Sequence, residues 1–572
     1  MPNQLVTKKD CNGLKVVLRP CFKLRFSTWE FFKNPCLSKE DLMAQVFKSD
    51  TGDSFQLRDI NSTALSKIVK QLQNKIKNKN WKKLVNFHCP VQGNGHKRSF
   101  GMIVVNKRDL VSLFRAIGND ILPNTLFGKK NKLLNQFVKN MCILLTAPGK
   151  NSPILLDQLC HRLNPAMILW TKDVSNDTQI QEWVLAKVVS WLATNIFWRT
   201  ITGFFGIMET SYGKNDICFV RKMHIQSALV KEINRLSSLH RIKFIESKQK
   251  IKKILDLPNA PAIARCRFLL KKNGTTRLIC MKRKVMDEMK NNDIRNKVTL
   301  LSFSAQKIPG LIDVKGVQFY SLWRNFVTQV KQGIHSKIYI IVTDIQDAYG
   351  SVDHSKLVSI VNKLRNDLPE HIYIHNVKYT YPNSSTRRIF HRRIPSYDKH
   401  FQFKFPAQTR PYEDKVNSVI ELNVNEMIQS VCQRIRLHTL SFTIGRKKNS
   451  YLLNHGLVQG DSLSVPLCNL YYGNMTYRHL KEFLTNDITE HNNGGHQRLL
   501  ARGMDDFIFA TTEMSEAERF LERMNRGFPD YGCQIQSDKT STNLEPCDVK
   551  RGKNRFKNSH KKIINCSISL IL

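Results

Sequence analysis

The stretch that most constrains the fold lies near the C-terminal end, where Asp505 and Asp506 stand between the apolar runs 499–501 and 507–510. Acidic residues are rarely buried unless a cation neutralises them. Two apolar strands joined at an acidic step are typical of a tight hairpin that lifts carboxylates out of a buried sheet toward a metal ion. An exposed turn between two strands is the alternative, and this stretch alone leaves both interpretations open.

The charge of the chain points to a polyanionic partner. Lys and Arg number 90 against 46 Asp and Glu, a net charge of +44 over 572 residues, and 41% of the residues are apolar, enough for folded cores. This balance favours nucleic acid and salt-dependent binding. The sequence has no apolar run of membrane-spanning length and no lipidation signal, so we predict no membrane partner. The 14 cysteines form no CxxC pair, which favours a reducing compartment.

A second acid follows another apolar strand. Residues 338–342 form an apolar run that leads to Asp344, and a helix is expected to begin near Ser355. This pattern predicts a buried strand that delivers the carboxylate of Asp344 at its C-terminal tip. Asp347 and Asp353 are predicted to be surface or helix-capping acids.

The region from about 100 to 245 has helical periodicity, most clearly over 179–198, and ends in a predicted hairpin over 204–222. Aromatic residues at one end of the hairpin and basic residues at the other suit a single-stranded RNA surface, although an ordinary amphipathic hairpin fits equally well. The residues expected to contact RNA are Phe204, Phe205, Tyr212, Lys214, Arg221 and Lys222.

A further hairpin is predicted over 265–280, with Asn273-Gly274 as its turn. Lys271 and Arg277 would then face each other across adjacent strands. Two cations held in this way would neutralise a triphosphate. Paired cations are common in basic proteins, so this signal depends on its neighbours.

Two features separate these strands from the acidic step. Residues 360–450 form an insertion rich in Arg, His and Tyr that we predict to be irregular. Gln459-Gly460 follows, and then small polar residues and an apolar helical run. A glycine at this point permits close approach of the backbone to a ligand.

Several of these segments resemble telomerase reverse transcriptases. The segment FFGIMETSYGKNDICFVRK (204–222) is similar to the T motif that ends the RNA-binding domain of that family, and LFRAIGNDILPNTLFGKKNKLLNQFVKNM (113–141) is similar to the helical core of the same domain. Other reverse transcriptases do not carry this signature. The resemblance implies that the helical region binds the telomerase RNA.

The resemblance continues through the reverse-transcriptase motifs in order. The 265–280 hairpin resembles motifs 1 and 2, which implies that Lys271 and Arg277 contact the incoming nucleotide. The strand ending at Asp344 resembles motif A, which implies that Asp344 binds both catalytic metal ions, that a neighbouring backbone carbonyl, assigned to Ile345, completes the shell, and that Tyr349 screens the sugar 2′ position.

The remaining motifs follow at the spacing of the family. Gln459 and Gly460 resemble motif B′, beside the nucleotide sugar and template base, and Asp505 and Asp506 resemble motif C. Residues 522–543 resemble motif D, which implies that Lys539 protonates the pyrophosphate. Asp344, Asp505 and Asp506 would then hold two Mg²⁺ ions, one activating the primer 3′-hydroxyl and the other shielding the leaving pyrophosphate.

The resemblance implies an α+β chain with a helical RNA-binding domain followed by right-hand polymerase fingers and palm, the palm carrying the carboxylates on an antiparallel sheet. It implies an RNA-directed DNA polymerase that extends chromosome 3′ ends in the nucleus, using an RNA template, a telomeric DNA primer and deoxynucleoside triphosphates, with accessory proteins. The expected divisions are a basic region (1–95), the RNA-binding domain (96–250), fingers with an insertion (251–335), the palm (336–545) and a basic tail (546–572).

The chain departs from the family pattern at two places. Most members have QGS where this chain has Gln459-Gly460-Asp461, a form more familiar in retroelement enzymes. A thumb should follow motif D, yet 29 residues remain after Asn543. We therefore expect RNA binding with poor primer extension. A retroelement reverse transcriptase and a truncated RNA-binding form of telomerase with little catalytic activity remain the alternatives.

Overall fold

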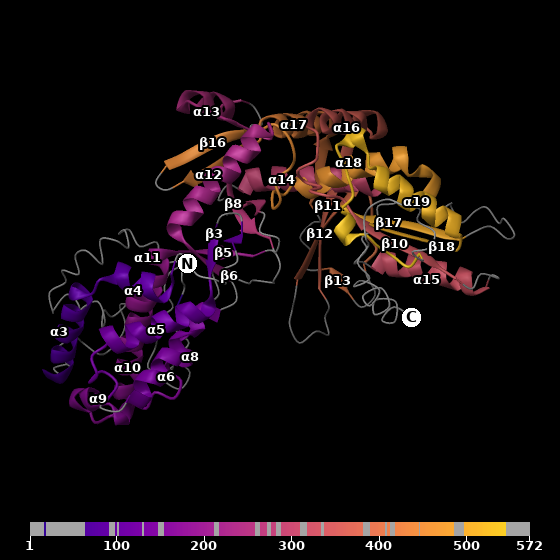
Figure 1. The fold of residues 1–572 in the computed structure, drawn as a ribbon. Helices are drawn as coiled ribbons and strands as arrows, with labels where there is room; N and C mark the ends of the chain where they lie inside the picture. Colours follow the sequence, from indigo (N-terminus) through magenta and orange to yellow (C-terminus); the bar gives the residue numbers. More distant parts are fainter. Residues whose placement is uncertain are drawn as a thin grey trace. The chain divides into compact units, whose positions relative to one another are not determined.

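The computed structural model describes residues 17–18, 63–90, 98–99, 102–128, 131–146, 154–210, 217–257, 263–271, 276–281, 288–308, 317–332, 337–380, 389–405, 409–411, 418–444, 447–484 and 497–544. The chain forms two compact units (Figure 1). The first contains Met1–Ile233 and Phe268–Arg277, and the second contains Asn234–Arg267 and Leu278–Leu572. Each described helix is too short or too polar to cross a membrane.

The first unit is mainly helical, and its helices come before its principal hairpin. Its elements are β1 (Val17–Leu18), α3 (Thr63–Asn78), α4 (Trp81–His88), β2 (Arg98–Ser99), β3 (Met102–Val105), α5 (Lys107–Ile121), α6 (Asn131–Met141), α7 (Ile143–Thr146), β4 (Ile154–Leu155), α8 (Leu156–Cys160), α9 (Leu169–Val174), α10 (Thr178–Leu192), a π-helical turn (Ala193–Trp198), α11 (Arg199–Phe204), β5 (Phe205–Glu209) and β6 (Ile217–Arg221). Helix α12 (Lys222–Ser238) continues from β6 across the boundary between the units.

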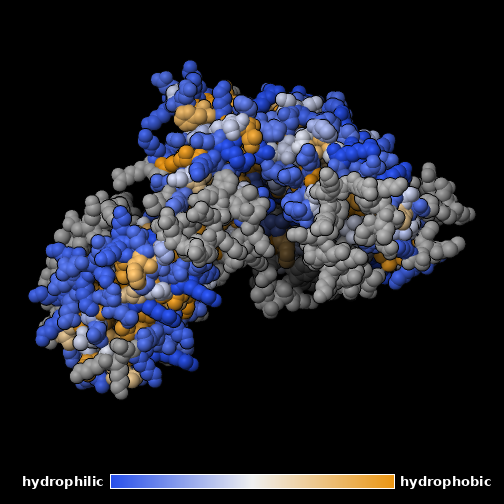
Figure 2. All heavy atoms as spheres, in the orientation of Figure 1, coloured by the Kyte–Doolittle hydropathy of each residue, from blue (hydrophilic) through white to orange (hydrophobic). Residues whose placement is uncertain are grey.

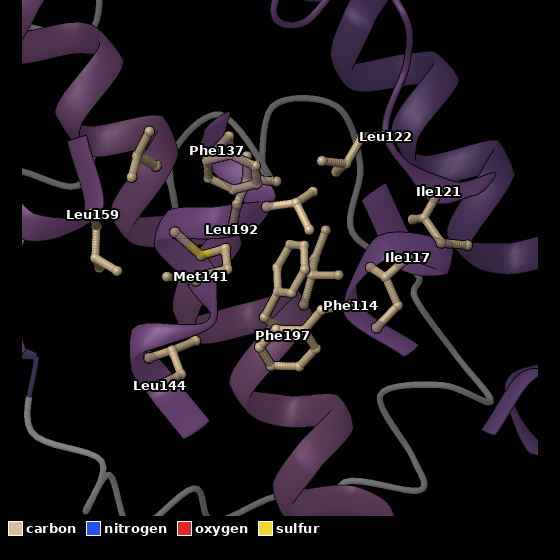
Figure 3. Close-up of a cluster of buried hydrophobic side chains, with 14 of the residues drawn as sticks. Phe114, Ile117, Ile121, Leu122, Phe137, Met141, Leu144, Leu159, Leu192 and Phe197 are labelled. Carbon is tan, nitrogen blue, oxygen red and sulfur yellow. The ribbon is translucent and has the colours of Figure 1, made fainter. Parts of the chain in front are cut away.

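Aromatic packing holds the helices of this unit together. Phe114 of α5 meets Phe197 edge to face with 4.9 Å between the ring centroids, and Phe137 of α6 meets the same ring at 5.6 Å (Figure 3). All three side chains are fully buried. Such aromatic pairs add about 1 kcal/mol each to the burial of their area. Because Leu65 and Trp81 belong to the same core, α3 and α4 pack with the helices that follow residue 95.

The hairpin predicted over 204–222 is present. Strands β5 and β6 pair antiparallel from Phe205↔Arg221 to Glu209↔Ile217, and β3 pairs with the other edge of β6. The predicted helix over 179–198 is present as α10, but its last turn widens into the π-helical segment.

The second unit combines several sheets with the helices that cover them. Its elements are β7 (Ile242–Phe244), α13 (Lys248–Leu255), α14 (Glu288–Gln306), α15 (Val317–Gln332), β10 (Tyr339–Asp344), α16 (His354–Asp367), β11 (His371–Thr380), β12 (Ile389–Ser396), β13 (Arg410–Pro411), β14 (Val419–Asn423), α17 (Val424–Arg436), β15 (Thr439–Ile444), β16 (Lys447–Leu453), α18 (Ser464–His479), β17 (Arg498–Gly503), β18 (Asp506–Thr511), α19 (Met514–Arg526) and β19 (Ser541–Thr542). The hairpin predicted over 265–280 is formed by β8 (Ala264–Leu270) and β9 (Thr276–Cys280), which cross the boundary between the units.

The central sheet of this unit has the order β17-β18-β10-β19 and is covered on both faces. Ile340 and Leu499 pack against Trp323 of α15, whereas Ile341 and Leu500 belong to the core that includes α18 and α19. Successive residues of a strand point to opposite faces, so a strand covered on both sides is apolar throughout. This explains the continuous apolar runs that precede Asp344 and flank the acidic step.

The insertion between residues 360 and 450 is more regular than its sequence suggests. Strand β11 pairs with β12 over eight residue pairs, from Tyr373↔Ser396 to Thr380↔Ile389, and β13 and β14 pair with its other edge. The prediction of an irregular segment was wrong. The many polar and basic residues of the segment, such as those exposed on β12, mask in the sequence the apolar pattern of the buried Ile372, Ile374 and Val377 of β11. Among the coloured residues on the face drawn in Figure 2, hydrophilic ones predominate.

Candidate functional site

The acidic step lies at the tip of a two-strand hairpin, as predicted. Strands β17 and β18 pair from Arg498↔Thr511 to Gly503↔Asp506, which leaves Met504 and Asp505 as the turn. Met504 has φ +58°, the left-handed backbone that such short turns need. On the other side of β18, Asp506 pairs with Asp344. The backbone register therefore brings the ends of both acidic segments together.

The carboxylates of Asp344, Asp505 and Asp506 form a compact cluster. One oxygen from each lies within 4.8 Å of the others. Asp344 is buried, Asp505 is half-buried and Asp506 is exposed. Burial, together with the neighbouring Asp344 carboxylate, raises the pKa of Asp505 above its usual range. Like charges at this separation disfavour full ionisation unless a cation lies between them.

A single lysine already contacts this cluster. Lys539, in a short 3-10 turn (Ser537–Lys539), donates a hydrogen bond to Oδ2 of Asp344. Its side chain is 55% exposed, whereas that of Asp344 is 9% exposed. The lysine therefore offsets the charge of Asp344 from the solvent side.

Arg502 holds the acidic turn from inside, although no sequence signal marks it. Its Nη1 donates to the backbone oxygen of Met504 at 2.8 Å, and its Nη2 donates to the backbone oxygen of Asn469 in α18 at 3.2 Å. The side chain is completely buried, and burial lowers the pKa of Arg502 to about 10. A basic residue inside an apolar strand is hard to recognise in sequence because its partners are backbone oxygens.

Ile345 and Tyr349, which follow Asp344 in the chain, also contact the acidic turn. The backbone N–H of Ile345 donates to the backbone oxygen of Asp505 at 3.1 Å. Tyr349 donates its Oη hydrogen to Sδ of Met504 at 3.3 Å. The structure thus places Ile345 and Tyr349 beside the carboxylates. The two other acids of this segment have the predicted roles, since Asp353 caps α16 and Asp347 pairs with Arg241 at 2.6 Å.

Gln459 and Gly460 form a turn that is held by strand β9. The backbone N–H of Cys280 donates to the oxygen of Gln459 at 2.8 Å. Gly460 has φ +90°, and a Cβ there would lie 2.9 Å from the oxygen of Cys280. Only glycine fits this close backbone approach without strain.

The two cations predicted to meet a triphosphate both belong to the first unit. Lys271 follows β8 directly and is half-buried, whereas Arg277 lies in β9 and is exposed. Their expected turn, Asn273-Gly274, lies outside the described residues.

The residues predicted to contact RNA divide into internal and external ones. Phe205 is buried, and the Arg221 guanidinium lies 4.9 Å from the centre of its ring. Arg221 also donates from Nη2 to the backbone oxygens of Val85, at 3.1 Å, and Cys89. These contacts join β6 to α4. Phe204 is half-buried, Lys222 is exposed, and Tyr212 and Lys214 lie outside the described residues.

The cluster of Asp344, Asp505 and Asp506 fits a divalent cation of the Mg²⁺ type. Carboxylate oxygens are the ligands that Mg²⁺ prefers, and it usually takes only a few from the protein. The three acids come from two adjacent strands and one tight turn, and Lys539 contacts one of them, Asp344. Such a site can hold and orient a phosphate-bearing substrate through the metal.

The chain is similar to telomerase proteins in each comparison. Residues 109–236 match the family described as the RNA binding domain of the telomerase ribonucleoprotein complex. The telomerase reverse transcriptase of Rattus norvegicus is 26% identical over 469 residues, covering 75% of this chain and 40% of the rat protein. That of Arabidopsis thaliana is 22% identical over 477 residues, covering 76% of this chain and 40% of the plant protein. The chain thus spans about two fifths of the length of these relatives.

Solved structures share the fold. The telomerase of Candida tropicalis in complex with a fragment of telomeric RNA has a TM-score of 0.63 at 15% identity, covering 91% of this chain and 75% of that chain. The same telomerase without RNA and truncated from its C-terminal domain has a TM-score of 0.60 at 15% identity, covering 91% of this chain and 92% of that chain. The mixture of helices and sheets in the present chain is therefore an arrangement that telomerases adopt.

Proposed function

We propose that the chain is a member of the telomerase reverse transcriptase family and an RNA-directed DNA polymerase that extends chromosome 3′ ends by copying a bound RNA. One observation carries the proposal: Asp344, Asp505 and Asp506 converge at the tips of paired strands with oxygens within 4.8 Å. Carboxylates this close repel one another, which favours a cation between them.

The cofactor in this proposal is a pair of Mg²⁺ ions. Asp344, Asp505 and Asp506 would hold them, with the backbone oxygen of Ile345 as a further ligand. When bound, the ions would lower the pKa of a primer 3′-hydroxyl and neutralise the departing pyrophosphate. The chain itself fixes the carboxylates, because Arg502 anchors the turn and Ile345 ties Asp505 to β10.

Lys539 is proposed to give its proton to the pyrophosphate. Its ammonium contacts Asp344 and is exposed on the other side, where a phosphate can reach it. If the Lys539 ammonium moves from the Asp344 carboxylate to the pyrophosphate, it keeps an anionic partner. It therefore stays protonated until it gives its proton to the pyrophosphate.

The substrates in this proposal are deoxynucleoside triphosphates and a single-stranded telomeric primer. Tyr349 lies beside the acidic turn, where an aromatic ring can exclude a ribose 2′-hydroxyl. The turn at Gln459 and Gly460 presents backbone on which a nucleotide can lie. Lys271 and Arg277 are proposed to neutralise the triphosphate.

The RNA template is proposed to bind the first unit, in the region that matches the telomerase RNA-binding family. Exposed Lys222 and half-buried Phe204 are its described candidates, together with Tyr212 and Lys214. We leave Phe205 and Arg221 out of this surface because they already bind each other and α4. The nucleus, at telomeres, is the proposed site of action, with accessory proteins as further partners.

Primer extension by the full chain tests the polymerase activity. The substrate is an oligo(dT) primer on poly(rA) with Mg²⁺ and dTTP. We expect templated extension by the wild type and none by Asp505→Ala. Glu522→Ala is the matched control, because Glu522 is an exposed acid of the same unit that pairs with Arg526, four residues away on α19, and this variant should extend normally.

RNA capture separates the proposed function from its alternatives. RNA that copurifies with the chain should contain a short repeated template, and Asp505→Ala should retain it. Extension of poly(rA) without such an RNA would favour a retroelement enzyme. RNA capture without any extension by the wild type would favour a binding protein with a palm that is only structural.

A further inference from the structure

Asp461, the residue at which the chain departs from its family, makes contacts that the proposed chemistry does not require. Its Oδ1 accepts a hydrogen bond from Nη2 of Arg434 at 2.9 Å, and its Oδ2 accepts one from the N–H of Leu463 at 3.3 Å. The side chains of Asp461 and Arg434 are 13% and 16% exposed. An ion pair this far from solvent is poorly screened and geometrically restrictive.

Arg434 belongs to a rigid part of the unit. It lies in the last turn of α17, between the buried residues Val431 and Ile435. Both of these pack in the core that also contains α16 and α18. Asp461 is therefore tied to a helix whose position is set by hydrophobic packing.

The turn next to Asp461 is held from its other side by β9. Cys280 donates its N–H to the oxygen of Gln459 at 2.8 Å, and Ile279 forms a β-bridge with Gln459. The turn of Gln459 and Gly460 thus lies between a strand and a helix. One hydrogen bond restrains its first residue, and the ion pair restrains the residue that follows it.

The surroundings of the ion pair leave no room for a ligand. The cavity beside Asp461, Arg434 and His438 has a volume of about 10 Å³, enough for one water molecule. Burial lowers the pKa of His438 to about 4, so this ring is neutral and adds no competing charge at neutral pH.

We propose that Asp461 is a positioning residue, which with Arg434 clamps the turn of Gln459 and Gly460 against β9 so that its backbone is ready to receive the incoming nucleotide. The proposal rests on the proposed polymerase function. Loss of the clamp would let the turn move away from Cys280. Nucleotide binding would then include the cost of ordering the turn, whereas the step after binding would change little.

Four variants of the full chain test this inference. Asp461→Asn keeps an oxygen for the Leu463 N–H and loses the charge, Arg434→Leu removes the other partner, and a double variant removes both charges. Glu516→Gln is the control, because the Arg498–Glu516 pair at 2.8 Å is also largely buried and joins α19 to β17 at the end away from the acidic turn.

Steady-state extension of poly(rA)·oligo(dT) gives the first readout. The two single variants and the double variant should raise the KM for dTTP about tenfold with kcat within about twofold. Glu516→Gln should leave KM unchanged. A purely stabilising pair predicts the opposite pattern for the double variant, namely wild-type KM once no unpaired charge remains, and that result would overturn the proposal.

Hydrogen exchange gives a second readout that needs no catalysis. The Cys280 amide should be protected in the wild type and in Glu516→Gln, and should exchange about tenfold faster in Asp461→Asn. Unchanged protection in Asp461→Asn would overturn the clamp even if the chain had no polymerase activity. Absence of extension by the wild type, with the predicted change in exchange, would count against the proposed function and leave the clamp standing.

Discussion

Two acidic sites of the second unit show opposite ways of holding carboxylates. At one, Asp344, Asp505 and Asp506 lie together, and Lys539 contacts Asp344. At the other, Asp461 is matched by Arg434 and by a backbone N–H. Both sites lie at turns that follow buried segments, and both include largely buried side chains.

The difference lies in the balance of charge. Asp461 and Arg434 neutralise each other, so this site is complete within the chain. In the cluster three carboxylates lie within 4.8 Å of one another, and burial together with repulsion from Asp344 raises the pKa of Asp505. An acid satisfied by its own chain indicates a structural role, whereas an acidic cluster left in excess indicates an external cation.

Removal of one carboxylate from the cluster should have the largest effect. Asp505→Ala should lower templated extension roughly a thousandfold or more, because the loss of one metal ligand removes several kcal/mol of transition-state stabilisation. RNA binding should stay within about twofold of the wild type, since the proposed RNA surface lies in the first unit. Primer extension and filter binding on the same preparation measure both quantities.

The corresponding change at the balanced site should reduce stability. Arg434→Leu leaves Asp461 buried without its partner, and we expect a loss of roughly 3 kcal/mol in the free energy of unfolding. Arg434→Leu combined with Asp461→Asn should recover about half of that loss, because no buried charge is left unpaired. Urea unfolding measures both. A double variant less stable than the single variant would contradict the charge-balance argument.

The cluster could be predicted from sequence because its signals are local. Continuous apolar runs predict strands covered on both faces, and an acid at the end of such a run must lie at the tip. The helix over 179–198 could be predicted from its local periodicity and the hairpins from their strand and turn patterns, whereas the segment 113–141 was assigned through the resemblance to a family. The register that brings Asp506 opposite Asp344 is a tertiary feature, which local patterns predict only through the resemblance to a family.

The balanced site could not be predicted. Arg434 and Asp461 are 27 residues apart, and their contact depends on how α17 packs. Arg221 shows the same limit, because a basic residue at a strand end looks like a surface cation, yet the fold turns it inward to carbonyl groups more than 130 residues earlier. Strand β11 was missed because its neighbours in sequence are basic and its partners are distant.

Divalent metal should stabilise the cluster and leave the balanced site unaffected. At a Mg²⁺ concentration about 100 times its dissociation constant, the folded state should gain roughly 2.7 kcal/mol per site. Asp505→Asn should lose most of this gain, and it should be more stable than the wild type in EDTA because one repelling charge is removed. Arg434→Leu should show the full gain. Thermal unfolding with and without Mg²⁺ makes this comparison, and an equal gain in Asp505→Asn would place the metal elsewhere.

The smallest effect should come from His438, which borders the balanced site. Its neutral ring is buried near Asp461, Arg434 and His354, and burial lowers its pKa from 6.5 to about 4. Between pH 6.5 and pH 4, His438 binds a proton more tightly in the unfolded state than in the folded state. Its contribution to the free energy of unfolding is therefore fully present above pH 6.5 and is lost as the pH falls toward 4. The loss due to His438 at pH 4.5 should be on the order of 2 kcal/mol.

His438→Phe should remove that part of the pH dependence, whereas His371→Gln, at an exposed ring, should retain it. Urea unfolding at pH 7 and pH 4.5 tests the prediction, and equal pH dependence in wild type and His438→Phe would show that His438 does not control the acid sensitivity of this site.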